Sequence, residues 1–543
     1  MSRSRHLRLP AALAALVLSG CAAMQAAQSN LRVPGTLAND QFTPGRPASA
    51  TFGDPAVAAC PVGGAYTELY ARVDDGAKAV GATPTPAEGR LCAVAEALLG
   101  WPEETPVAEG PLAFLSGHYG LENPAGQAFV TTLETEDPRE IAKNLAATIA
   151  SYGSKVPTAA YGVASTRLKK DRTKVVLVLA NASIRLDPPL PRRLEAGQKA
   201  ALSGTLQGDL DTPKVLVSDA QGKVATFEQP AGKAFKAEVA CGQQPGRIVA
   251  EIRGEEMGNE RVLSTLEVAC ASPLPTTASL AKAAWPADAA GQERKLTELI
   301  NAERTAAGLP ALAWSDPVGK VARAVAESLR ANGQKPGSAQ PVNLVQKLAE
   351  ADVSTPVILQ NPAAAPTAEQ AYRRLMVSPS HRANVMSTEV NTFGVGVAAG
   401  EDAAKHQLTY LTQIFIKIQP PPDLAAYKAT VREVIARKRA AEKLAPVTED
   451  AALAQLAQDY AAAVAAAEGK PSKATYENLV KALNKGFRSV DLLTSVKLDP
   501  ADYAEEPNLL SKGKLLGLGA ALGKHPAYGK NSVFLVMLIA SRR

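Results

Sequence analysis

The sequence predicts a multi-domain α+β protein in which an all-β module separates segments of mixed helices and strands. The chain has 543 residues, which is long enough for about three to four domains. Apolar residues recur at helical spacing on both sides of residues 187–272, whereas within that range they alternate with a period of two. Stretches rich in Pro and Ala, typical of linkers, interrupt these patterned segments.

Residues 1–20 have the features of a bacterial lipoprotein signal peptide. Three arginines precede the apolar run 9–18, which is too short to span a bilayer. The run ends in Leu-Ser-Gly-Cys, which resembles a lipobox, so Cys21 is expected to carry diacylglycerol and palmitate. The alternative is an ordinary secretory signal with a chance Cys. Because Ala22 follows, and not Asp, the resemblance to lipoprotein sorting signals implies the outer membrane.

The lipid on Cys21 is the expected connection to the membrane, because no later stretch approaches 18 uninterrupted apolar residues. Residues 21–58 are rich in small and polar residues and are expected to form a flexible tether. The net charge of +6 is small for this length and argues against nucleic acid as a partner.

Four further cysteines, Cys60, Cys92, Cys241 and Cys270, remain in the mature chain. An even number in an exported protein suggests disulfides, for which three pairings are possible. The pairing of Cys60 with Cys92 and of Cys241 with Cys270 is favoured, because each pair then falls within one candidate domain. A cysteine zinc site is not indicated, because no two of them lie two to four residues apart.

Residues 59–186 form the first expected folded unit. Their pattern predicts helices and then paired strands around a variable middle, over residues 66–79, 88–99, 141–152, 159–168 and 174–184. His118 and Glu122 lie in that middle, where neighbouring Gly and Pro residues favour a surface turn over a helix. The order of elements suggests a diverged copy of a unit that recurs later in the chain.

Short alternating runs separated by turn residues predict a β-sandwich over residues 187–272. This segment resembles the immunoglobulin-like spacer modules of surface proteins. Residues 273–289 are expected to form a linker, and two further α+β segments follow it, at 290–418 and 427–543.

Residues 290–418 carry the most specific motif. Helical segments, the string Ser-Pro-Ser-His-Arg-Ala-Asn and two strands follow one another over residues 299–329, 367–377, 378–384, 391–398 and 409–415. This order resembles the CAP superfamily (cysteine-rich secretory proteins, antigen 5 and pathogenesis-related proteins) in its bacterial form. The resemblance implies an α-β-α sandwich. It also implies a cleft with two His and two acidic residues, a set that suits a divalent metal.

Most of the family's metal ligands are missing from this sequence. His381 matches the His of the family motif, but the family's Glu-Asn pair falls on Gln360 and Asn361, so an amide replaces the carboxylate. The family's first His should fall near 334–345, which contains none. The remaining cleft candidates are Arg382, Asn384, Gln413 and, as a weak candidate for a further acid, Glu369.

No cofactor is therefore expected, and Zn²⁺ would be the candidate ion if one bound. One imidazole surrounded by neutral amides would hold a metal weakly. The simpler interpretation of His381 is a buried, hydrogen-bonded residue near a helix end. Catalytic residues are not indicated, because Gly-x-Ser-x-Gly, His-Glu-x-x-His and a free reactive Cys are all absent from the sequence.

The segment 427–543 parallels the segment before it. Residues 298–312 align with 433–447, which places Arg304 over Arg439. Lys-Pro pairs close the two helical regions at the same offset. A fixed order of matching segments indicates an internal repeat, in which the second copy has lost the motif His.

The resemblance implies a binding role. Together with the lipobox, the lost ligands, the spacer and the degenerate copies favour a non-enzymatic binding or adhesion lipoprotein, periplasmic or on the cell surface. Its ligand would be a lipid, a glycan or a protein. One alternative is a metal-assisted hydrolase using His381, which needs two carboxylates or a second His close by. The other is a purely structural envelope protein whose cleft is filled by side chains.

Overall fold

The computed structural model of the chain describes residues 34–542, except 82, 104, 170, 230, 280–284, 335–339, 419 and 498. The signal peptide, Cys21 and the start of the expected tether therefore lie outside the described residues. The chain divides into two compact units. The first runs to Ala284 and includes Met376–Ala383, and the second contains Trp285–Leu375 and Asn384–Arg543.

The described part of the expected tether is folded, so that expectation is wrong for residues 34–52. Its strands pair with one another and with distant segments: β1 (Thr36–Ala38) and β2 (Gln41–Thr43) with β16 (Ala278–Ser279), and β3 (Thr51–Phe52) with β8 (Leu190–Pro191). Phe42 is fully buried with its ring edge-on to Trp101, and Phe52 joins the core of the all-β part. Two buried aromatic side chains thus anchor a segment that otherwise has few large apolar residues.

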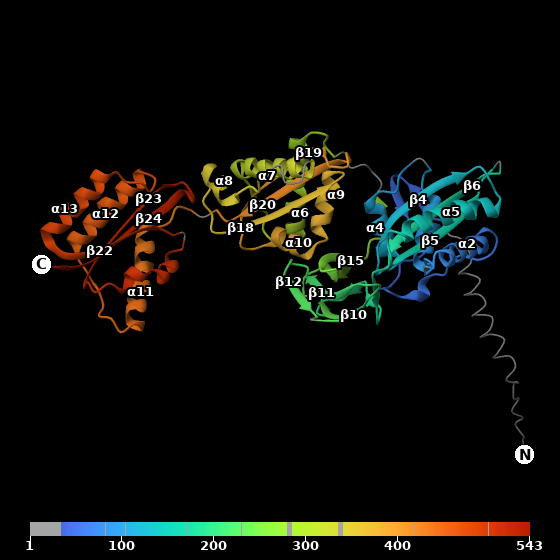
Figure 1. Ribbon diagram of the computed structural model, residues 1–543, viewed down its shortest axis with the longest axis horizontal. Coiled ribbons are helices and arrows are strands. Elements are labelled where there is room, and N and C mark those ends of the chain that lie inside the picture. The colour runs from blue at the N-terminus through green and yellow to red at the C-terminus, as the bar shows by residue number, and fades with distance from the viewer. Residues whose placement is uncertain are drawn as a thin grey trace, which may run out of the picture. The chain divides into compact units, whose positions relative to one another are not determined.

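The α/β part of the first unit has one three-stranded antiparallel sheet (Figure 1). In chain order its elements are α2 (Ala65–Ala79), α3 (Gly89–Ala97), α4 (Glu109–His118), β4 (Ala125–Leu133), α5 (Pro138–Gly153), β5 (Ala159–Arg167) and β6 (Thr173–Asn181). The strand order is β4-β6-β5. Helices α3 and α4 contribute to one apolar core, and α2 and α5 to another. The structure thus places α4 and β4 in the middle segment for which no element was expected.

The all-β part of the first unit consists of two sheets that share one apolar core. Its strands are β7 (Ile184–Leu186), β9 (Arg193–Leu194), β10 (Lys199–Leu206), β11 (Asp211–Ser218), β12 (Val224–Glu228), β13 (Ala234–Ala240), β14 (Gly246–Glu256) and β15 (Asn259–Cys270). The sheet orders are β13-β10-β7 and β12-β11-β14-β15-β9. Side chains that alternate along these strands supply the core, as the period of two predicts.

Both favoured disulfides are present. Cys60 is bonded to Cys92 across 32 residues, and Cys241 to Cys270 across 29 residues. The second pair belongs to the all-β core, where both half-cystines are buried.

The second unit begins with a four-stranded sheet of order β17-β19-β20-β18. Its elements are α6 (Ala289–Ala306), β17 (Ala313–Trp314), α7 (Asp316–Gln334), α8 (Leu344–Glu350), β18 (Ile358–Ala365), α9 (Ala368–Met376), α10 (Pro379–Met386), β19 (Thr392–Glu401) and β20 (Gln407–Ile416). Helix α7 packs its apolar side chains against β20. Of α10, residues up to Ala383 group with the first unit.

A second sheet of the same order, β21-β23-β24-β22, completes the second unit. Its elements are α11 (Leu424–Ala441), β21 (Thr448–Glu449), α12 (Ala451–Ala466), α13 (Lys473–Gly486), β22 (Phe487–Val496), β23 (Leu515–His525) and β24 (Gly529–Arg542). Helix α11 contributes to one apolar core, and α12 and α13 to another.

One packing device recurs in all three α/β sheets. A helix backbone lies directly against a strand at a glycine: α3 at Gly162, α7 at Gly396 and α12 at Gly519. A Cβ atom at these positions would come within 2.0, 2.2 and 2.1 Å of helix backbone atoms, far closer than any side chain tolerates. Each of these strands also has a parallel partner on its outer edge, which is β17, β21 or the isolated bridge from Ala87 to Tyr161.

A buried arginine recurs in the two sheets of the second unit. Arg304 donates to the carbonyls of Pro310, Val385 and Ser387 at 2.7–2.9 Å. Arg439 donates to those of Ala445, Leu509 and Ser511 at 2.7–2.9 Å. Each guanidinium thus joins the loop after the first helix to the segment that leads into the strand carrying the glycine.

Replacing Arg304 should destabilise its sheet strongly. Arg304→Met keeps the apolar stem but leaves three carbonyls without their donor, which is expected to cost about 3 kcal/mol. Equilibrium urea unfolding of the chain from Ala22 onward measures the change. Arg294→Met alters an exposed arginine on the same helix and should stay within about 0.5 kcal/mol of the wild type. Equal effects of the two substitutions would contradict this role.

Loss of the second disulfide should also lower stability. Closing a loop of 29 residues restricts the unfolded chain by about 3.5 kcal/mol. The double change Cys241→Ala and Cys270→Ala should therefore lower the urea midpoint markedly. Peptide mapping under non-reducing conditions should still find Cys60 joined to Cys92. A mixed pairing in the wild-type chain would refute the assignment.

Candidate functional site

The predicted cleft residues of the second unit meet in a network of amides. Asn361 in β18 lies opposite Gln413 in β20, and its Nδ2 donates to Gln413 Oε1 at 3.0 Å. Asn384 in α10 donates its Nδ2 to Asn361 Oδ1 at 2.8 Å and to the Gln360 carbonyl at 3.3 Å. Asn361 and Gln413 are fully buried. The three amides therefore satisfy one another beside Gln360, the position on which the family's Glu falls.

One donor in this network is left over. Gln413 Nε2 is buried and has no partner among the described residues. A buried N–H group without a partner costs about 1–3 kcal/mol. The network is thus an uncharged polar cluster with an excess of donors, which is the opposite of what a cation requires.

Arg382 is not available to a ligand in the cleft. Its side chain is almost fully buried within the first unit. It donates to Ser218 Oγ at 3.1 Å, the Asp219 carbonyl at 2.7 Å and the Ala220 carbonyl at 2.9 Å. These three residues begin the turn between β11 and β12, so the guanidinium of the motif anchors this turn.

His381 is half-buried, and burial lowers its pKa below the usual value for histidine. The charge of Glu251 in β14 opposes this shift, and that of Arg253 adds to it. Glu251 is buried and already paired, since Arg253 Nε donates to its Oε1 at 2.6 Å. Local sequence patterns could not indicate this neighbour of His381, because Glu251 lies 130 positions earlier on an alternating strand.

Glu369, the weak candidate for a further cleft acid, already has a basic partner. Glu369 lies on α9 and pairs at 3.1 Å with Arg373 one helical turn later. Both side chains are more than a third exposed. The spacing of four residues on a helix explains this pair without a ligand.

The residues present do not fit a resident divalent metal. His381 is the family ligand that remains, and the amide oxygens Asn361 Oδ1 and Gln413 Oε1 already accept hydrogen bonds. Among the described residues, no group of three or more His, Cys, Asp or Glu side chains could hold a metal ion. Such ions in proteins are held by several imidazole, thiolate or carboxylate ligands at once.

His118 and Glu122 are buried, so the expectation of a surface turn is wrong. His118 is the last residue of α4, and its Nε2 lies 2.9 Å from the Arg46 carbonyl. Burial lowers its pKa, and the charge of Arg192 adds to this decrease. Glu122 forms an ion pair with Arg90, which is also buried. Segments distant in the sequence cover both residues: the Ser49 amide donates to the His118 carbonyl, and Ser264 in β15 donates to the Glu122 carbonyl.

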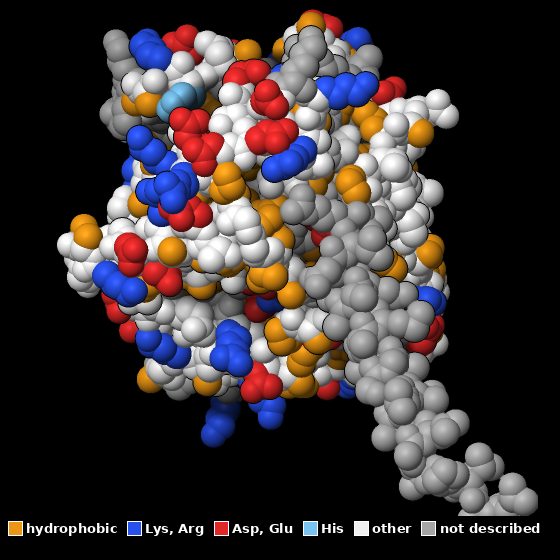
Figure 2. Space-filling model, turned by 90° about the vertical axis from the view of Figure 1, so that its right-hand side faces the viewer, with side chains coloured by type: hydrophobic (Ala, Val, Ile, Leu, Met, Phe, Trp, Pro, Cys, Tyr) orange, Lys and Arg blue, Asp and Glu red, His pale blue; other side chains and the backbone are white. Residues whose placement is uncertain are grey.

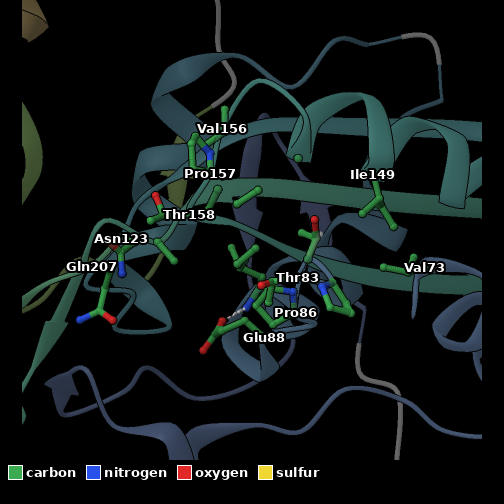
Figure 3. A pocket seen from close by; sticks show the side chains of 18 of the residues that line it. Val73, Thr83, Pro86, Glu88, Asn123, Ile149, Val156, Pro157, Thr158 and Gln207 are labelled. Carbon is green, nitrogen blue, oxygen red and sulfur yellow. Dashed lines mark hydrogen bonds between the residues drawn. The ribbon is translucent and has the colours of Figure 1, made fainter. Parts of the chain in front are cut away.

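A cavity of about 660 Å³ lies beside this ion pair (Figure 3). It is lined by the ends of α2 and α5, the loop 83–86 and residues from the all-β part. Local sequence patterns could not predict this cavity, because its walls come from segments up to 136 positions apart, such as Arg72 and Gly208.

Comparison with known proteins finds a family match for one part of the chain. The model of the Cysteine-rich secretory protein family matches residues 297–415. No curated protein matches the chain. Among the described residues, no helix is both long and apolar enough to cross a membrane.

Three solved structures are similar at low sequence identity. An outer surface protein from Borrelia burgdorferi is 19% identical over 23% of this chain and 92% of its own, with a TM-score of 0.19. An extracellular protein containing an SCP domain from Bacillus anthracis is 17% identical over 44% and 67%, with a TM-score of 0.21. A cysteine-rich secretory protein from Staphylococcus aureus is 12% identical over 50% and 92%, with a TM-score of 0.20. On the family match, this mixed α/β, multi-domain chain contains a CAP domain at residues 297–415.

Proposed function

We propose that the chain is a membrane-anchored lipoprotein of the cell envelope that binds a ligand or partner and does not catalyse a reaction. The observation that carries this is the amide network of Asn361, Gln413 and Asn384. A buried carboxylate among them would have to be paired or coordinate a metal. Neutral amides that bond to one another need neither, which favours a binding role over metal-assisted hydrolysis.

The anchoring rests on the N-terminal sequence. The basic segment and the short apolar run lead into Leu-Ser-Gly-Cys. The Cys of this string, Cys21, would carry the acyl chains. Several acyl chains on one residue give stable anchoring without a spanning helix. The similar structures are described as an outer surface, an extracellular and a secretory protein, which agrees with an exported chain.

The domain organisation supports a scaffold built from copies. The three α/β sheets share the strand order, the helix against a glycine and the parallel partner at one edge. We infer that 59–186 and 427–543 are diverged CAP-type copies, and that the two sheets between 187 and 272 form an immunoglobulin-like spacer. On the face shown in Figure 2, basic and acidic side chains are interspersed, which favours a partner other than nucleic acid.

A purely structural role is the second candidate. The amides of Asn361 and Gln413 in the CAP domain bond to each other, and Arg382 donates to a turn between β11 and β12. A binding role therefore needs a cavity elsewhere, and the first unit provides one.

Zinc should not bind the cleft. Titration of Zn²⁺ into the chain from Ala22 onward is expected to show no binding tighter than micromolar, because three of the four ligands are missing. His381→Ala should leave the heat unchanged. His406→Ala is the matched control for weak binding at an exposed imidazole. Stoichiometric, tighter binding that is lost only in His381→Ala would revive the hydrolase alternative.

Cys21→Ala should release the full-length chain from the membrane fraction of a bacterial host. Metabolic labelling with palmitate should mark the wild type and not the variant. Ala22→Asp keeps the acceptor Cys and should therefore stay lipidated while moving to the inner membrane. A Cys21→Ala chain that remains membrane-bound would show that another segment anchors it.

A further inference from the structure

The cavity of the first unit is built like a ligand site. Its volume of about 660 Å³ lies within the range of small-molecule pockets. Most of its wall is apolar, with side chains from α2, α3, α5 and the loop after α5 that include Val73, Leu91, Ile149, Val156 and Pro157. In Figure 3, Val73 and Ile149 lie to one side of Glu88, and Asn123 and Gln207 to the other.

Three charged side chains, Glu88, Arg90 and Glu122, contribute to the wall of the cavity. Arg90 Nε donates to Glu88 Oε1 at 2.6 Å. Arg90 Nη1 pairs with Glu122 and donates to the Gly120 carbonyl at 3.0 Å. The side chains of Arg90 and Glu122 are less than a tenth exposed. Burial by itself would lower the pKa of Arg90, but the two carboxylates outweigh it and raise the pKa. One cation thus faces two carboxylates.

The other charged residues of the cavity wall do not compensate this excess of one negative charge. Arg72 is paired with Glu68 at 2.9 Å, and Arg185 is exposed, where water and salt screen its charge. Glu88 is the more accessible of the two carboxylates, with 28% of its side chain exposed. It accepts from Arg90 and, through Oε2, from the Leu91 amide at 2.7 Å. A carboxylate has about four acceptor sites, so Glu88 retains capacity for a further donor.

We propose that this cavity binds an amphiphile with an apolar body and a basic amine, the amine lying beside Glu88. An apolar body would remove the cavity wall from water, and an ammonium group would neutralise the second carboxylate. An anionic head would instead meet two carboxylates and a guanidinium whose Nε and Nη1 already donate to Glu88, Glu122 and Gly120. The proposal gives a ligand class to the binding role proposed above, on which it rests.

The test compares three probes of equal length: octylamine, octanol and octanoate. Isothermal titration into the chain from Ala22 onward should find octylamine bound about tenfold more tightly than octanol, with octanoate weakest. Glu88→Gln keeps the acceptor for the Leu91 amide and should remove most of the preference for the amine. Glu140→Gln removes an exposed carboxylate on α5 outside the cavity and should change nothing.

Ala146→Phe places a ring in the cavity wall and should weaken all three probes together. Octanoate binding as tightly as octylamine, an amine preference that survives Glu88→Gln, or no heat from any probe would each overturn the proposal. None of these results bears on the zinc titration or on Cys21, so the ligand class and the proposed anchored, non-catalytic role fail separately.

Discussion

The direct contact between a helix backbone and a strand is the constraint on which each α/β sheet depends. At Gly396 the strand β19 approaches α7 so closely that any side chain would collide with the helix backbone. This contact fixes the height of the helix over the sheet. The neighbouring strand then presents its alternate side chains to a core of set depth, and the short parallel strand aligns on the free edge. A single small residue therefore determines the spacing of two layers.

The buried arginines complete that arrangement at the end of the sheet. Irregular segments bring carbonyl groups into the interior, where each needs a donor. Arg304 and Arg439 each supply several donors from one rigid group. They therefore satisfy carbonyls that helix or strand hydrogen bonds would otherwise have to satisfy. The first α/β sheet has the same glycine contact, but there Arg90 donates to the Gly120 carbonyl. Arg90 also forms ion pairs with two carboxylates. The three α/β sheets thus share the packing of a helix on a glycine and differ in the polar chemistry around it.

Local pattern predicted the elements well because each depends on near neighbours. Helices α2, α3 and α5 follow the apolar spacing, and the CAP motif gave the strands β19 and β20. Pairings that depend on distant segments could not be predicted in this way. Asn361 finds Gln413 through a strand register 52 positions away, and Phe42 packs on Trp101 despite a polar surrounding sequence. Glycines around His118 and Glu122 suggested exposure, but burial there is decided by strands and loops that arrive from elsewhere in the chain.

Charged side chains in the interior of this chain have polar partners: Arg304 donates to backbone carbonyls, and Glu122 pairs with Arg90. An isolated buried carboxylate would be costly without a metal or a basic partner, and the side chains of the cleft network are uncharged amides. Amides at Asn361 and Asn384 then maintain the geometry without a counter-ion. In the first unit the opposite holds, because Arg90 compensates Glu122 and leaves Glu88 partly open to the cavity. The chemistry capable of recognising a charged ligand therefore lies beside Arg90, in the sheet whose sequence carries the weakest resemblance to the family.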